Sequence, residues 1–156
     1  MIEDRLNIQI NASPHAVFNL IDRMPNKFPI YDFFETKPIL FLRLLLVDGL
    51  ESARAAMKVD RDIEELHLGI GDPMGPFTLI DRESPSTYCF SLKSLFFNCR
   101  TGYFLTDQDG RTCLNFDLIS ENPTLREKVW WFVFKPMHRF FGKKVLSVIK
   151  EKAELN

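Results

Sequence analysis

The sequence predicts an α+β fold in which an antiparallel β-sheet packs against a long C-terminal helix. Residues 6–10 alternate apolar and polar side chains, which is the pattern of a strand with one buried face. Residues 62–121 form short apolar segments separated by Gly, Pro, Asp and Ser, which indicates a series of strands. The segment after residue 122 instead repeats apolar side chains every three or four positions, as an amphipathic helix does.

The first strand is followed by a predicted helix. Ser13 can cap a free helix amide, and Pro14 suits the first helical position because its missing N–H needs no partner there. The helix should bury one stripe of apolar side chains, formed by Val17, Leu20, Ile21 and Met24.

Residues 25–61 carry no pattern that defines their elements. The run at 39–47 is too apolar all round for a surface helix, so we expect it to be buried or to lie over a pocket. Arg43 lies within this run, where an unpaired charge would be costly to bury. We expect Arg43 to pair with a carboxylate of the protein, and the alternative is that it anchors the carboxylate of a ligand.

Five further strands are predicted at residues 63–70, 77–82, 87–93, 95–106 and 111–120. The turn Asp107–Gly110 is a hairpin signal because its Asp-Gly pair tolerates positive φ. Consecutive strands joined by such short turns must be antiparallel.

The C-terminal helix is predicted to open with Asn122 as its cap and Pro123 in its first turn. Pro136 predicts a kink or a break, because proline removes an amide donor and crowds the preceding turn. The predicted buried stripe consists of Trp130, Phe134, Met137, Phe141, Val145 and Val148.

Length and charge narrow the functional classes. A chain of 156 residues suits a single domain, 1–156, with one core. Its formal net charge of −1 gives no overall field that favours nucleic acid. Residues 1–5 lack the features of a signal peptide, and no apolar run approaches the ~20 residues that span a bilayer. We therefore expect a cytoplasmic protein.

No metal or cofactor is expected. Cys89, Cys99 and Cys113 lack metal-ligand spacing, and we expect reduced thiols on buried or half-buried strand positions. The histidines are His15, His67 and His138. They form no pair at helical spacing that would indicate zinc.

Segments 6–18 and 130–154 resemble the helix-grip fold of the START and birch-pollen-allergen superfamily, SRPBCC. The stretches FLRLLLVDGL, LHLG, GPFTLI and KPMHRFFGKKVL are similar to a small bacterial family of unassigned function within it. The resemblance implies a curved antiparallel sheet wrapped around the C-terminal helix. It also implies a cavity between them for lipids, sterols, polyketides or other flat apolar molecules, without implying one chemistry.

The abundance of aromatic side chains supports a ligand pocket. The chain has 15 Phe, more than a routine core needs. Each ring taken alone is more often core than ligand contact, but large rings on facing elements do not always fill the space between a curved sheet and a helix. The predicted ligand-binding residues are Phe77, Tyr88, Phe90, Phe97, Cys99, Tyr103, Phe116, Trp130, Phe134, His138 and Phe141.

The main functional hypothesis is a binder or carrier of a small hydrophobic molecule, since no catalytic motif is present. An alternative is a cyclase or dehydratase in which His138 or Tyr103 transfers protons, although a histidine in this position more often borders a core. The sequence leaves the ligand, any catalysis and the oligomeric state open.

A third hypothesis concerns the charge of the C-terminal helix. Residues 126–152 contain eight basic residues against Glu127 and Glu151, a local net charge of +6. With Trp130, Trp131 and Phe140 nearby, this helix could make a peripheral contact with an anionic membrane or an acidic partner. The simpler interpretation is the solvated outer face of a core helix.

Overall fold

An antiparallel sheet and a long C-terminal helix dominate the computed structural model, which describes residues 1–23, 41, 45, 49–51, 53–54, 68–74, 77–93 and 97–155. The elements in order are β1 (Ile2–Ile10), α1 (Pro14–Arg23), β2 (Pro73–Met74), β3 (Phe77–Glu83), β4 (Thr87–Lys93), β5 (Asn98–Gln108), β6 (Arg111–Ser120) and α4 (Leu125–Glu154). The predicted α+β class is confirmed. Arg43 and His67 lie outside the described residues.

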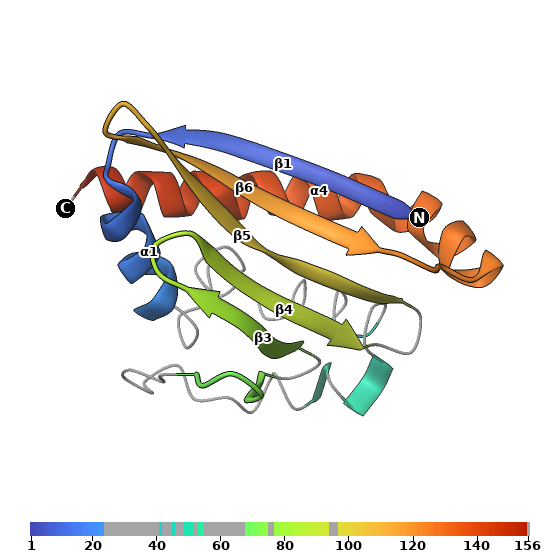
Figure 1. Cartoon of the computed structure of the whole chain (residues 1–156). Helices are drawn as coiled ribbons and strands as arrows, with labels where there is room; N and C mark the ends of the chain where they lie inside the picture. The colour runs from blue at the N-terminus through green and yellow to red at the C-terminus, as the bar shows by residue number, and fades with distance from the viewer. Residues whose placement is uncertain are drawn as a thin grey trace.

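The sheet has six strands in the order β1-β6-β5-β4-β3-β2, and every neighbouring pair is antiparallel. Strand β1 therefore lies beside β6, far from it in sequence, and not beside β2. Figure 1 shows α4 running beside β1, with α1 near the C-terminal end of α4. This arrangement confirms the predicted sheet packed on a C-terminal helix.

The predicted hairpin between β5 and β6 is present. Asp109 and Gly110 both adopt positive φ, at 55° and 80°. The backbone N–H of Gly110 donates to Asp107 Oδ1 at 2.9 Å, which closes the turn. Asp-Gly therefore acts here as its sequence predicts.

Helix α1 begins at the predicted cap. Ser13 Oγ accepts a hydrogen bond from the backbone N–H of Ala16 at 3.3 Å. Val17 and Ile21 are buried as predicted, and Phe18, which the predicted stripe omitted, is buried beside them. These side chains join strand and α4 residues in one core cluster.

The predicted start of the C-terminal helix is wrong by two residues. The N-cap is Thr124, whose hydroxyl accepts from the backbone N–H of Glu127, while Glu127 accepts from the backbone N–H of Thr124. This reciprocal capping box satisfies two helix-end amides, which Asn122 does not do here. The helix continues through Pro136 without interruption, so the predicted break does not occur.

The buried face of α4 also differs from the predicted stripe, being centred about one residue later. A Cβ at Gly142 would approach Leu6 Cδ1 to 2.5 Å, so the glycine allows close contact between the helix and β1. This contact orients the rest of the helix and leaves Trp130, Phe134, Met137, Phe141 and Val148 only half-buried. The buried side chains are Glu127, Trp131, Val145, Leu146, Ile149 and Ala153.

The strand predicted at residues 63–70 does not extend over its last three residues, 68–70. Residues 68–72 form a turn, in which the backbone N–H of Gly69 donates to Asp72 Oδ2 at 2.8 Å and Gly71 has a φ of 96°. The two glycines favour this turn over an extended strand. Residues 61–67 lie outside the described part.

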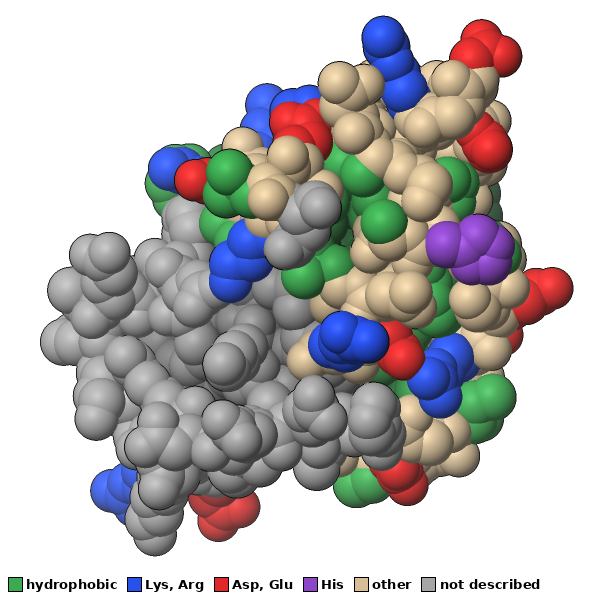
Figure 2. Space-filling view, turned by 90° about the vertical axis from the view of Figure 1, so that its left-hand side faces the viewer, with side chains coloured by type: hydrophobic (Ala, Val, Ile, Leu, Met, Phe, Trp, Pro, Cys, Tyr) green, Lys and Arg blue, Asp and Glu red, His purple; other side chains and the backbone are tan. Residues whose placement is uncertain are grey.

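The surface at the α1 end of the molecule is mixed in charge. Figure 2 views this end, and the described atoms show basic and acidic side chains interspersed with hydrophobic ones. This pattern agrees with the formal net charge of −1 for the whole chain.

Candidate functional site

The candidate site is the face of the sheet that packs against α4, which we call the inner face. The strand register places Leu6, Phe116, Tyr103 and Tyr88 side by side across four strands of this face. The neighbouring row runs through Asp4, Leu118, Thr101 and Phe90. The inner face therefore presents rings from several strands, with a few polar groups among them.

Aromatic side chains of α4 contact this face through a series of rings. Phe97 stacks on Trp130 and on Trp131, with centroid distances of 5.6 and 5.5 Å. Trp130 stacks in turn on Phe134 at 4.4 Å. Phe97 and Trp131 are buried, whereas Trp130 and Phe134 remain half-buried.

His138 joins α4 to the centre of the sheet. Its ring lies 5.3 Å from Trp131 and stacks on Phe116 at 5.7 Å. Phe116 then contacts Tyr103 at 5.2 Å. His138 is part of an aromatic contact between helix and sheet, with 11% of its side chain exposed.

A second group of rings lies on the same face, toward the edge of the sheet formed by β3 and β4. Phe77 meets Phe90, and Phe90 meets Tyr88, in edge-to-face contacts at 6.1 and 5.2 Å. Tyr88 also contacts Phe18 of α1 at 6.1 Å. Such geometries are the ones that aromatic quadrupoles favour.

The structure brings most of the predicted ligand-binding residues together on or against the inner face. Cys99 is buried in the same cluster as Phe97 and Trp131. Phe141 is half-buried on α4, where its ring contacts that of Phe140 at 5.5 Å. Arg43 lies outside the described residues, so its role as an anion anchor stays a prediction.

Two buried hydroxyl groups on the inner face have no hydrogen-bond partner among the described residues. They are Tyr88 Oη and Thr101 Oγ1. Burial raises the pKa of Tyr88 to about 12, so its hydroxyl stays protonated and can donate. A buried hydroxyl left unpaired costs about 1–3 kcal/mol, so a water or a guest molecule is expected to satisfy each of them.

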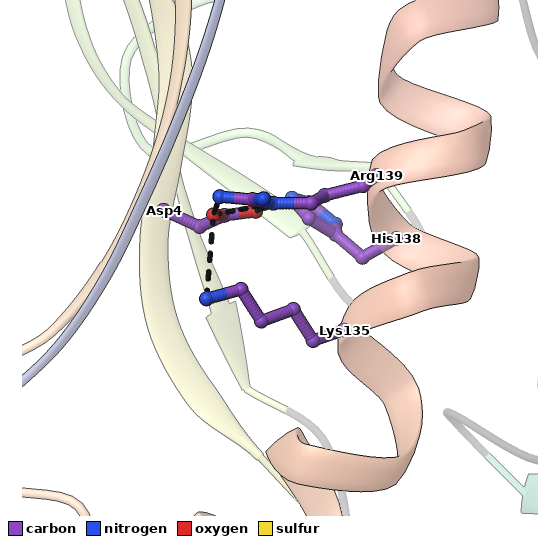
Figure 3. Close-up of polar contacts among 4 residues, drawn as sticks. All are labelled: Asp4, Lys135, His138 and Arg139. Carbon is purple, nitrogen blue, oxygen red and sulfur yellow. Dashed lines mark hydrogen bonds and ion pairs between the residues drawn. The ribbon is translucent and has the colours of Figure 1, made fainter.

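One acidic side chain is buried on the inner face, where residues of α4 surround it (Figure 3). Arg139 donates from Nη2 to Asp4 Oδ1 at 2.6 Å and from Nε to the same oxygen at 2.9 Å. Lys135 Nζ and His138 Nε2 lie 3.9 and 4.0 Å from the carboxylate. Hydrogen bonding to Asp4 raises the pKa of Arg139, and this ion pair ties β1 to α4.

The contacts of Asp4 with α4 do not place His138 as the partner of a catalytic carboxylate. The distance between His138 Nε2 and Asp4 Oδ2 is 4.0 Å, beyond hydrogen-bond reach, and Arg139 already occupies the carboxylate. Burial raises the pKa of Tyr103 above its ordinary value of 10, so this phenol stays protonated at neutral pH. Both residues of the enzyme hypothesis also contact the ring of Phe116, and their role in proton transfer stays a prediction.

Within the described ranges, no three His, Cys, Asp or Glu side chains come together in a way that could hold a metal ion. None of the helices described is long and apolar enough to cross a membrane.

Four residues of this site were missed by sequence reasoning. Asp4 and Thr101 are polar residues in apolar strand phases, and the alternation of β1 extends back to Ile2. That extension would have placed Asp4 on the buried face. Trp131 and Phe18 each lie one position away from the predicted helical stripes, and no local signal distinguishes them.

No family model and no curated protein matches this chain. Solved structures do. The Aha1 dimer from Colwellia psychrerythraea matches with 14% identity and a TM-score of 0.53, over 99% of this chain and 97% of that one. Protein MLL2253 from Mesorhizobium loti matches with 10% identity and a TM-score of 0.53, over 96% and 98%. Protein Ms6760 from Mycobacterium smegmatis matches with 13% identity and a TM-score of 0.53, over 96% of this chain and 88% of that one.

The chain thus has a helix-grip fold, which it shares with these solved structures. Sequence identities of 10–14% show that the fold is shared, and they carry no information about a shared activity. The function must therefore be argued from the inner face itself.

Proposed function

We propose that this protein binds a small apolar molecule between the inner face of the sheet and α4, as a binder or carrier. Supporting this, rings from both layers meet there, and several of them, including Phe116, Trp130 and Phe134, are only half-buried. Half-buried rings keep part of their surface available to a guest.

The observation that carries the proposal is the pair of buried hydroxyls. Tyr88 and Thr101 lie among apolar neighbours, and their hydroxyls find no partner in the described chain. A polar group on a guest would satisfy them and orient it, while the rings contribute dispersion and apolar burial. We therefore expect a flat or elongated apolar guest that carries one or two polar atoms.

Displacement of a fluorescent probe tests this proposal. Purified protein is titrated with 1-aminoanthracene, a flat apolar fluorophore, and candidate fatty acids, sterols and aromatic polyketides are then scored as competitors. Native mass spectrometry of freshly purified protein checks for a co-purified small molecule. A chain that enhances no fluorescence and carries no adduct would contradict the proposal.

Matched variants test the role of the hydroxyls. Thr101→Val removes one hydroxyl from the inner face and should weaken the best competitor roughly fivefold, the effect of one lost hydrogen bond. Thr106→Val makes the same change at an exposed position of β5 and serves as the control. Tyr88→Phe removes the second hydroxyl. If neither inner-face variant changes the affinity of any competitor, water occupies these hydroxyls and guest contact with them is refuted.

A further inference from the structure

The outward face of α4 carries a row of exposed apolar side chains. Phe132 and Val133 have relative exposures of 83% and 74%, and Phe140 has 57%. Scattered apolar side chains on a surface are ordinary, but a contiguous row of large ones is not. We call this row the outer stripe; it consists of Leu125, Val129, Phe132, Val133 and Phe140.

The outer stripe lies opposite the buried face of the helix. Its members follow one another at steps of four, three, one and seven residues, which places them within a sector of about one-third of the helical circumference. Trp131, Gly142 and Ile149 occupy the opposite side and pack in the protein. Helix α4 is therefore apolar on two faces, only one of which the core uses.

Basic side chains border the outer stripe along both edges. On the helical projection, Lys128 lies along one edge, and Arg126 and Lys144 lie along the other. Lys143 follows at the C-terminal end of the stripe. All four are exposed.

Acidic charge is nearly absent from this part of the helix. Residues 125–144 contain six basic residues and one acidic residue, a local formal charge of +5. The acidic residue, Glu127, is buried in the capping box and lies on the opposite side from the outer stripe.

From these features we propose that the outer stripe of α4 docks on an anionic lipid bilayer. The apolar side chains enter the boundary between headgroups and acyl chains, and the long basic side chains reach the phosphates beside them. Charge complementarity favours this occupant, because neighbouring bilayer phosphates match basic residues on both edges of the stripe. The proposal concerns the outer face and does not depend on whether the inner face binds a guest.

A second copy of the chain is a weaker candidate for the same surface. Symmetric pairing of two outer stripes would bring two segments of +5 formal charge together, and like charges oppose such pairing. The one acidic residue of this segment, Glu127, is buried in the capping box and cannot compensate this charge.

Vesicle flotation tests the proposal. The full chain is mixed with vesicles of phosphatidylcholine alone, or with about one-third phosphatidylglycerol, at low and high NaCl. We expect binding to the anionic vesicles to exceed binding to the neutral ones about tenfold and to fall at high salt. Equal binding to both vesicles, or no binding to either, would overturn the proposal.

Apolar variants show whether the outer stripe is the contact. Phe132→Ala combined with Phe140→Ala should reduce binding about tenfold, because two large rings no longer enter the bilayer. Ile70→Ala combined with Ile80→Ala is the control, since both isoleucines are exposed elsewhere. Equal losses in the two double variants would refute the assignment.

Charge variants test the basic edges. The double variant Lys128→Gln with Lys143→Gln should bind anionic vesicles more weakly, and its binding should depend less on salt. The control, Lys93→Gln with Arg111→Gln, removes the same charge from exposed strand positions and should change neither property. Analytical ultracentrifugation without lipid tests whether the outer stripe instead pairs with a second copy of the chain. A dimer that dissociates when Phe132 and Phe140 are replaced would overturn the bilayer proposal in favour of a second copy.

Discussion

Glu127 joins the first turn of α4 to the start of β5, because its Oε1 accepts a hydrogen bond from the backbone N–H of Asn98 at 3.0 Å. Its Oε2 accepts from the backbone N–H of Thr124 at 2.7 Å. One carboxylate therefore caps a helix and fixes the position of that helix on the sheet.

This arrangement predicts a specific loss of stability in acid. Hydrogen bonds, first of all from Thr124, lower the pKa of Glu127. A carboxyl group with a depressed folded pKa stabilises the protein above its unfolded value of about 4.3 and loses that contribution as pH falls through the folded value. Unfolding free energy measured in urea between neutral pH and acid should therefore fall less steeply in Glu127→Gln than in the parent chain.

At neutral pH the Glu127→Gln substitution should cost about 1 kcal/mol, as the loss of a capping interaction usually does. Glu151→Gln, at an exposed position of the same helix, is the control and should change neither the stability nor its slope. An identical acid slope in Glu127→Gln and the parent would refute the role of this carboxylate.

Two glycines should differ in their tolerance of alanine. A Cβ at Gly102 would lie 2.6 Å from the backbone oxygen of Tyr88 and 2.7 Å from Cys89 Cα, and paired strands cannot separate to accommodate it. We expect Gly102→Ala to cost about 3 kcal/mol in urea unfolding.

At Gly142 the added Cβ would meet Leu6 Cδ1, the flexible end of a side chain. Alanine also gains about 1 kcal/mol of helix propensity over glycine, which offsets part of the clash. Gly142→Ala should therefore cost clearly less than Gly102→Ala. The reverse order would contradict the packing described for β4 and β5.

The ion pair between Asp4 and Arg139 predicts a coupled pair of substitutions. Asp4→Asn and Arg139→Gln should each lower the thermal midpoint, by several degrees for the buried Asp4, and the double variant should lose less than the sum. Differential scanning calorimetry measures all four proteins of this cycle. Additive losses would show that the two residues stabilise the protein independently.

The cysteines predict an order of thiol reactivity. Burial raises the pKa of Cys99 to about 12 and also raises the pKa of Cys89, so both thiols stay protonated at mildly alkaline pH. Cys113 is half-buried and should react first with a disulfide reagent. All three should react at once in urea. Native Cys99 reacting as fast as Cys113 would indicate that the inner face opens readily.

Local patterns predicted the elements better than their orientations. The alternation in β4 and β6 predicted both strands with their observed bounds. The Asp-Gly pair predicted the hairpin that joins β5 to β6. Such patterns depend on neighbours a few residues apart, which the sequence contains directly. Burial of Tyr88, Phe90 and Phe97 followed from the same alternation.

Features that depend on distant contacts were not predictable in this way. The rotation of α4 about its axis depends on the close approach of Gly142 to Leu6, which no helical period encodes. The position of Asp4 inside the protein becomes favourable only because Arg139 reaches it from α4. The unpaired hydroxyl of Thr101 likewise becomes visible only when the neighbouring strands are in place.

The pairing of β1 has a consequence for the order of folding. Arg5 contacts Asp117 across a separation of 112 positions, and Asp4 contacts Arg139 across 135. Closing such long loops is slow, and the strand cannot complete either contact while its partners are still being synthesised. During translation β1 therefore cannot pair with β6 until β6 has been synthesised, and Asp4 cannot contact Arg139 until α4 has followed.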